Sequence, residues 1–122
     1  MDAELAALSL AIGQAAMTRS ATIATAESCT GGWAAQVITH TAGSSAWFDR
    51  GFITYSNAAK SDMLGVKNMT LATHGAVSEA TAREMALGAL IHSAASYALA
   101  ITGIAGPAGG SRSAEVSTEV KE

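Results

Sequence analysis

Cysteines, charged residues and long apolar runs are all scarce in this chain, and each scarcity removes a class of protein. Cys29 is the single cysteine, so neither an intrachain disulfide nor a zinc site of several cysteines is available, which fits a reducing cytoplasm. Seven basic against ten acidic residues, without a cluster of Lys or Arg, exclude nucleic acid as the main partner. No run reaches the ~20 apolar residues of a membrane span, and Asp2 and Glu4 stand where a signal peptide would be basic. We therefore expect a cytoplasmic protein without membrane contacts.

Apolar residues are present in the amount that a folded core requires. They make up 49% of the 122 positions, and many of them are alanine. This composition is typical of a folding chain and not of a disordered one. The length suits one domain.

Helical and strand patterns alternate along the chain. Apolar residues recur every three or four positions in the helical segments, and short apolar runs with β-branched or aromatic residues mark the strands. The predicted order is a helix at 3–18, a strand at 22–26, a helix at 31–41, a strand at 46–55, a short helix from Ser56 or Asn57 to Gly65, a helical turn near 70–73, a long helix capped by Ser78, and a strand at 97–102. Gly51 interrupts the second strand, which we interpret as a bulge.

This alternation predicts an α/β fold, a three-layer αβα sandwich around a parallel or mixed sheet. Ligands of such sheets bind beyond the carboxyl ends of the strands. Three turns rich in glycine and hydroxyl side chains follow residues 26, 55 and 102. All three turns should therefore lie at the edge of the sheet where a ligand binds.

The first turn, at residues 25–32, places Ser28 just before a predicted helix. Unpaired N–H groups at a helix N-terminus favour developing negative charge, which suits a serine nucleophile. The backbone N–H groups of Thr30, Gly31 and Gly32 are candidate donors to an oxyanion. The alternative is that these are ordinary turn and capping residues.

The second turn brings four kinds of polar group together. Tyr55, Ser56, Asn57 and Lys60 supply a phenol, a hydroxyl, an amide and an ammonium group. Ser56 and Lys60 share a helix face if the helix begins that early. The alternative is an ordinary helix cap beside a solvated lysine.

The third turn, at residues 103–110, resembles a phosphate cradle because its small residues let backbone N–H groups approach an anion. Thr102, Gly103 and Gly106 are the candidate binding residues. No helical pattern follows this turn, so a dinucleotide-binding fingerprint is not predicted.

The remaining polar residues indicate neither a metal site nor a histidine-based triad. His40, His74 and His92 fall on helices or helix ends, away from the strand termini, so we expect surface or capping roles for them. No pair of histidines, paired carboxylates or cysteines has the spacing of metal ligands, and we expect no metal and no cofactor. Asp49 and Arg50 are interpreted as a surface ion pair.

Five segments together resemble the CinA C-terminal domain family, whose stand-alone members include nicotinamide-nucleotide amidases. These are AESCTGG at 26–32, GSSAWFDRGFITYSNAAK at 43–60, LGV at 64–66, HGAVSE at 74–79 and TGIAGPAGG at 102–110. They follow one another with fitting spacing, and the resemblance covers residues 3–111. It implies an α/β sandwich that hydrolyses the carboxamide of nicotinamide mononucleotide to nicotinic acid mononucleotide and ammonia, in pyridine-nucleotide salvage.

Amide hydrolysis needs a nucleophile, a base, oxyanion donors and an acid for the leaving ammonia. We predict Ser28 as nucleophile, Lys60 as a desolvated neutral base and Tyr55 as proton relay. A charged Lys60 that holds the substrate phosphate stays open as an alternative. Cys29 is the rival nucleophile, although neighbouring side chains in an extended segment point to opposite sides. Glu27 either orients the site or binds the ribose.

The resemblance weakens toward the end of the chain. Family members continue past the glycine-rich segment into further strands and a helix, whereas residues 112–122 are polar and charged here. We expect an incomplete domain at 1–111 and a mobile tail at 112–122 that replaces no strand, leaving a sheet edge and an apolar surface exposed. A non-catalytic nucleotide-binding domain, or an inactive remnant acting as an assembly module, stays open beside the enzyme, as does a homo-oligomer.

Overall fold

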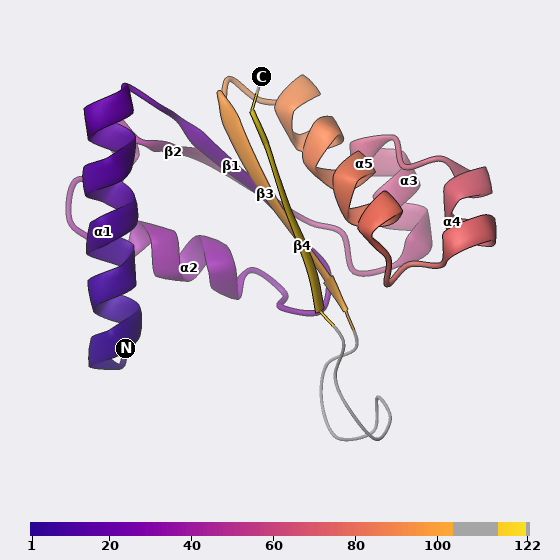
Figure 1. Cartoon of the computed structure of the whole chain (residues 1–122), viewed down its shortest axis with the longest axis horizontal. Helices are drawn as coiled ribbons and strands as arrows, with labels where there is room; N and C mark the ends of the chain where they lie inside the picture. Colours follow the sequence, from indigo (N-terminus) through magenta and orange to yellow (C-terminus); the bar gives the residue numbers. More distant parts are fainter. Residues whose placement is uncertain (104–114, 122) are drawn as a thin grey trace.

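The chain folds into three layers, with a mixed sheet between two groups of helices (Figure 1). The structure is a computed structural model that describes residues 1–103 and the backbone of residues 115–121. Its elements are α1 (Ala3–Arg19), β1 (Ile23–Glu27), α2 (Trp33–Thr39), the 3-10 turn η1 (Ser44–Ala46), β2 (Phe48–Ile53), α3 (Asn57–Leu64), α4 (Asn68–His74), α5 (Glu79–Ile91), β3 (Tyr97–Gly103) and β4 (Glu115–Lys121). The predicted α/β class is confirmed, as is the predicted element order as far as β3.

The sheet has the strand order β2-β1-β3-β4. β1 pairs in parallel with β2 and with β3, whereas β4 runs antiparallel to β3. The three parallel strands therefore end at one edge of the sheet, at Glu27, Ile53 and Gly103. This is the edge at which the three predicted turns begin.

β4 overturns the expectation that the tail at 112–122 replaces no strand. Its seven residues pair with the whole of β3, from Tyr97 opposite Lys121 to Gly103 opposite Glu115. The expectation was wrong because it rested on the overall polarity of residues 112–122. Val116, Thr118 and Val120 alternate with polar residues in the sequence, and this period of two is typical of a strand. Residues 112–114 and 122 lie outside the described residues.

Small residues line the sheet face that α5 covers. Ala24 and Ala26 of β1 and Ala98 and Ala100 of β3 have no solvent exposure, and they pack in one cluster with residues of α5. The opposite face packs against α1 and α2 through a second cluster around Ile38 and Trp47. Side chains alternate between the two faces along each strand, so Ser28, which follows β1, continues on the α5 side.

The irregularity in β2 lies at Asp49 and not at Gly51. Ile23 pairs with Phe48 and Ala24 pairs with Arg50, which leaves Asp49 as the extra residue of a bulge. Gly51 is needed for another reason. A Cβ at that position would lie 2.6 Å from Thr25 Oγ1 on the neighbouring strand.

Gly88 allows the backbones of α5 and α3 to touch, and we predict that Gly88→Ala destabilises the protein. A Cβ at Gly88 would lie 2.0 Å from the carbonyl oxygen of Leu64. Alanine in a helix interior normally stabilises by roughly 0.5–1 kcal/mol relative to glycine. Here the clash should outweigh that gain and cost about 1–3 kcal/mol. Urea unfolding measures the difference, with the exposed Leu87→Ala as control. An equal or higher stability of Gly88→Ala would contradict the contact.

Candidate active site

The structure joins the first and second turns through Ser28 and Lys60. Ser28 follows β1, and Lys60 lies in the first half of α3, yet Lys60 Nζ is 3.0 Å from Ser28 Oγ. Both residues are buried, with 6% and 1% of their surface exposed. A serine hydroxyl held against a buried lysine amine is an arrangement in which the amine can accept the hydroxyl proton.

Lys60 is held by backbone carbonyl groups on its other sides. Nζ donates to the carbonyl oxygens of Thr54 at 3.0 Å and Tyr55 at 3.1 Å. Burial lowers the pKa of Lys60 below its ordinary value, and the charge of the nearby Cys29 sulfur raises it by a smaller amount. Lys60 is therefore easier to deprotonate than a solvated lysine.

Glu27 lies at the end of β1 and organises the turn that follows. Its carboxylate accepts hydrogen bonds from Thr30 Oγ1 at 2.5 Å and from the backbone N–H groups of Gly32, Ala34 and Ala35 at 3.2, 2.9 and 2.9 Å. Only 1% of Glu27 is exposed. These four bonds occupy both carboxylate oxygens with the turn and the first residues of α2.

The glycines of the first turn serve its backbone geometry. Gly31 and Gly32 have φ angles of 58° and 105°, in a backbone region that residues with a Cβ rarely adopt. The N–H of Gly31 donates to the carbonyl oxygen of Ser28 at 3.1 Å, and that of Gly32 donates to Glu27. Both predicted oxyanion donors thus have an acceptor within the turn. Thr30 N–H, the third candidate, donates to no acceptor among the described residues.

Tyr55 reaches the site through its carbonyl group, which sequence reasoning missed. The Tyr55 carbonyl oxygen accepts from Lys60 Nζ and from Ser28 Oγ at 3.3 Å. The residue is 69% exposed, and among the described contacts its phenol bonds neither Ser28 nor Lys60. A proton relay through the phenol therefore has no bonded path in this structure.

The beginning of α3 has the helix cap that the sequence allowed, but the lysine beside it is buried and not solvated. Ser56 is the N-cap, and its Oγ accepts from the N–H of Ala59 at 3.0 Å. Asn57 is exposed as the first residue of the helix. Ser56 also accepts the N–H of Lys60 at its carbonyl, which fixes where the lysine side chain starts.

The end of β3 lies beside the same edge of the sheet. Thr102 is buried, and its hydroxyl donates to the carbonyl oxygen of Ala76 at 2.9 Å, so it ties β3 to the loop between α4 and α5. Gly103 is the last residue of the strand. Gly106, the remaining candidate for phosphate binding, lies outside the described residues.

The residues predicted to lie away from the site do so. His40, His74 and His92 are exposed at helix ends. Asp49 and Arg50 form the predicted ion pair at 2.7 Å. Their side chains also bond the backbone of Ala94 and of His92, so the pair ties β2 to the loop before β3.

Thr54 is a further residue of the site that the sequence did not reveal. It follows β2 without any exposed surface, donates its N–H to the carbonyl of Glu27 at 2.8 Å and offers its own carbonyl to Lys60. Carbonyl contacts of this kind leave no signature in residue type. Only its position at a strand end points to it.

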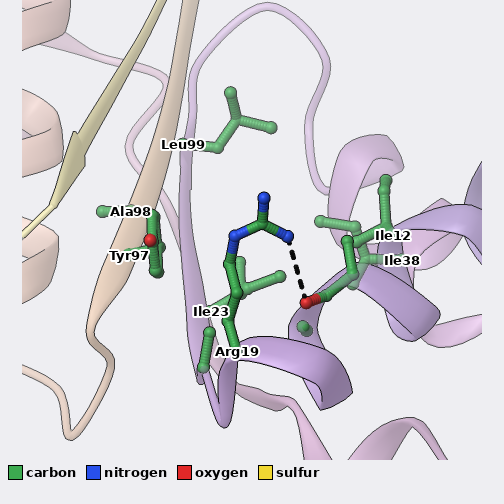
Figure 2. A pocket seen from close by; sticks show the side chains of 10 residues that line it. Ile12, Arg19, Ile23, Ile38, Tyr97, Ala98 and Leu99 are labelled. Carbon is green, nitrogen blue, oxygen red and sulfur yellow. Dashed lines mark hydrogen bonds between the residues drawn. The ribbon is translucent and has the colours of Figure 1, made fainter.

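Two cavities lie away from Ser28 and Lys60. The first, of about 430 Å³, lies at the amino ends of the strands, and Figure 2 shows the Arg19 side chain extending into it from α1. Its walls include Ile23 and Tyr97, which begin β1 and β3. The second, of about 560 Å³, lies between the start of α1 and α2. Ser28 and Lys60 line neither of these two cavities.

No three or more His, Cys, Asp or Glu side chains in the described chain are grouped to hold a metal ion. No described helix combines the length and the apolar character that crossing a lipid bilayer requires.

Comparisons with known proteins agree with the resemblance drawn from the sequence. The model of the CinA C-terminal domain matches residues 5–120, which extends the resemblance beyond residue 111 and through most of β4. Nicotinamide-nucleotide amidohydrolase PncC of Escherichia coli K12 is 62% identical over 117 residues, which are 96% of this chain and 71% of that protein.

Solved structures share the fold. Competence/damage inducible protein CihA from Agrobacterium tumefaciens is 52% identical with a TM-score of 0.86, and the match covers 91% of this chain and 67% of that one. Competence damage-inducible protein A from Klebsiella pneumoniae is 34% identical with a TM-score of 0.84 and covers 93% and 81%.

Proposed function

Because the chain belongs to the CinA C-terminal domain family, we propose that it is a nicotinamide-nucleotide amidase with Ser28 as nucleophile. It would convert nicotinamide mononucleotide and water to nicotinic acid mononucleotide and ammonia. The similarity to a protein named nicotinamide-nucleotide amidohydrolase supports the substrate. The observation that carries the mechanism is the 3.0 Å contact between Lys60 Nζ and Ser28 Oγ in a buried site.

The reaction proceeds in two halves at this pair. Neutral Lys60 takes the proton of Ser28 Oγ while the oxygen attacks the carboxamide carbon, and it then gives that proton to the leaving nitrogen. The C–N bond breaks, ammonia leaves, and the acyl group stays on Ser28. Lys60 next takes a proton from water, which attacks the acyl carbon and releases the carboxylate as Ser28 regains its hydrogen.

The base role of Lys60 is favoured over the phosphate-binding role. Its Nζ is buried, and three protein oxygens surround it at 3.0–3.1 Å. An ammonium group that binds a substrate phosphate needs donors directed at the solvent side of the site. Lys60 has its donors directed into the protein.

The oxyanion and the nucleotide would be held by the surrounding turns. Of the three candidate donors, Thr30 N–H is the one without an acceptor among the described residues, and it would face the oxyanion on the attacked carbon. Asn57 lies beyond the end of β2, and Thr102 and Gly103 lie at the end of β3. These two strands flank β1, and ligands of such sheets bind at this edge. We propose these three residues as contacts to the nucleotide, with Ser56 and Gly106.

Ammonia release from nicotinamide mononucleotide tests the activity, with free nicotinamide as comparison substrate. We expect turnover of the nucleotide and little of the free base, because the proposed turns recognise the ribose phosphate. Calorimetry on the same protein separates the alternatives. Binding without ammonia release would favour the non-catalytic domain, and the absence of both would reject the proposal.

The rate should rise with pH as Lys60 loses its proton. Since burial lowers the pKa of Lys60, the midpoint of kcat/KM should fall below the ordinary lysine value of about 10.4. An unfolded chain has the ordinary pKa and binds more protons between the two values, so stability attributable to Lys60 should increase across the same interval. Initial rates at constant ionic strength measure the midpoint. A rate that falls over this interval while the protein stays folded would contradict a neutral base.

A further inference from the structure

We infer that Glu27 is a positioning residue that sets the oxyanion donor, and this inference rests on the proposed nucleophile Ser28. Glu27 immediately precedes Ser28 in the chain, and its carbonyl oxygen is fixed by the N–H of Thr54 at 2.8 Å. Its side chain lies on the opposite face of the sheet from Ser28, toward α2. Glu27 therefore does not take part in the proton transfer.

The hydrogen bonds of the turn leave one of the three candidate oxyanion donors, Thr30, Gly31 and Gly32, without an acceptor among the described residues. Ser28 N–H donates to Ile101, Gly31 N–H to Ser28, and Gly32 N–H to Glu27. Thr30 N–H has no described acceptor, and the Thr30 hydroxyl is bonded to Glu27 Oε1 at 2.5 Å. The same carboxylate oxygen thus holds the side chain of Thr30 and the backbone two residues later.

This arrangement gives a donor that needs no rearrangement when negative charge develops on the substrate. An oxyanion donor is effective because its direction is set before the reaction, and the loss of one such donor typically costs about 10²–10³ in rate. Glu27 holds the Thr30 side chain and the Gly32 N–H through bonds in which it is only the acceptor. The side chain acts through Thr30 and contacts no reacting atom.

The test begins with Glu27→Gln, whose amide nitrogen cannot accept a hydrogen bond. If the glutamine oxygen takes the place of Oε1 and accepts from Thr30 and Gly32, the glutamine NH₂ lies against the N–H of Ala35. Two donors then face each other, so the turn must shift. We expect kcat for nicotinamide mononucleotide to fall about 10- to 100-fold with KM changed less than about threefold. The rate at which a fluorophosphonate labels Ser28 should fall in parallel, because that adduct also develops charge on oxygen.

Glu84→Gln is the matched control. Glu84 also accepts a backbone N–H and a threonine hydroxyl, from Lys67 at 2.9 Å and Thr70 at 2.6 Å, at the start of α4. Both variants should lose thermal stability, but only Glu27→Gln should lose kcat. Equal kcat losses in the two variants would reduce Glu27 to a structural role and overturn the inference.

Thr30 supplies a milder pair of variants should Glu27→Gln fail to fold. Thr30→Val removes the hydroxyl that Glu27 accepts, whereas Thr30→Ser keeps it. We expect kcat to fall about tenfold in Thr30→Val and to be restored in Thr30→Ser. Full kcat in folded Thr30→Val, or a change in KM alone in any of these variants, overturns the positioning role.

The failure of this inference is distinguishable from failure of the proposed function. An inactive Ser28→Ala protein together with fully active Glu27→Gln and Thr30→Val proteins rejects only the positioning role. An active Ser28→Ala protein rejects the nucleophile, whatever the Glu27 variants do.

Discussion

Ser28→Ala should lower ammonia release from nicotinamide mononucleotide by at least about 10³-fold while the protein stays folded. Alanine removes the oxygen that is held 3.0 Å from Lys60 Nζ, and no acyl intermediate can form without it. The side chain that remains is smaller, so no steric clash is introduced into the buried site. Turnover with excess substrate measures the effect, and a thermal melt checks the fold.

Cys29→Ala is the matched control for this prediction because Cys29 is the neighbouring residue and the rival nucleophile. It should keep most of its turnover. The charge of Cys29 only modulates the pKa of Lys60, and burial has the larger effect on that pKa. An inactive Cys29→Ala protein beside an active Ser28→Ala protein would transfer the nucleophile to the thiol.

Lys60→Arg should lower kcat by about 10²–10⁴-fold, the range expected for loss of a general base. Arginine keeps a positive charge but stays protonated at any pH that the protein tolerates, so it cannot accept the Ser28 proton. The alkaline rise in rate should disappear as well. Initial rates across the pH range measure both effects, and a melt establishes that the larger side chain is accommodated.

Two further variants complete this experiment. Lys67→Arg makes the same change at an exposed lysine and should keep wild-type turnover. Lys60→Met removes the amine with less added bulk and should be inactive as well. Near-wild-type kcat in folded Lys60→Arg would instead show that charge suffices, which is the expectation for a phosphate ligand.

The sequence predicted most of the fold because its signals are local. Ser56 and Ser78 cap α3 and α5 as expected, and Gly65 ends α3 in the left-handed conformation. The bulge at Asp49 was misplaced at Gly51, since a glycine in a strand can equally mark close packing between neighbouring strands. β4 was not predicted because the charge of residues 115–121 outweighs the alternation of Val116, Thr118 and Val120 with polar residues.

The candidate site was predictable in residue type and only partly in geometry. Ser28 follows β1, and Lys60 lies in α3, which follows β2. The sequence therefore predicted both at the same edge of the sheet, and the structure places them in contact there. The bonds that occupy the N–H groups of Gly31 and Gly32 depend on which way each peptide faces, which composition does not encode. The same holds for Tyr55, where the backbone carbonyl and not the phenol meets the lysine.

The alanine faces of β1 and β3 change which kind of core substitution destabilises the protein. In a core of large aliphatic residues, a substitution that deletes methyl groups is costly because it leaves a cavity. Where Ala24, Ala26, Ala98 and Ala100 already lie without exposed surface against α5, little remains to delete, and harm comes from addition. Lineages of this fold should therefore retain small residues at these four positions even where they tolerate wide change on the surface, and a gain of bulk there requires a compensating loss on the facing helix.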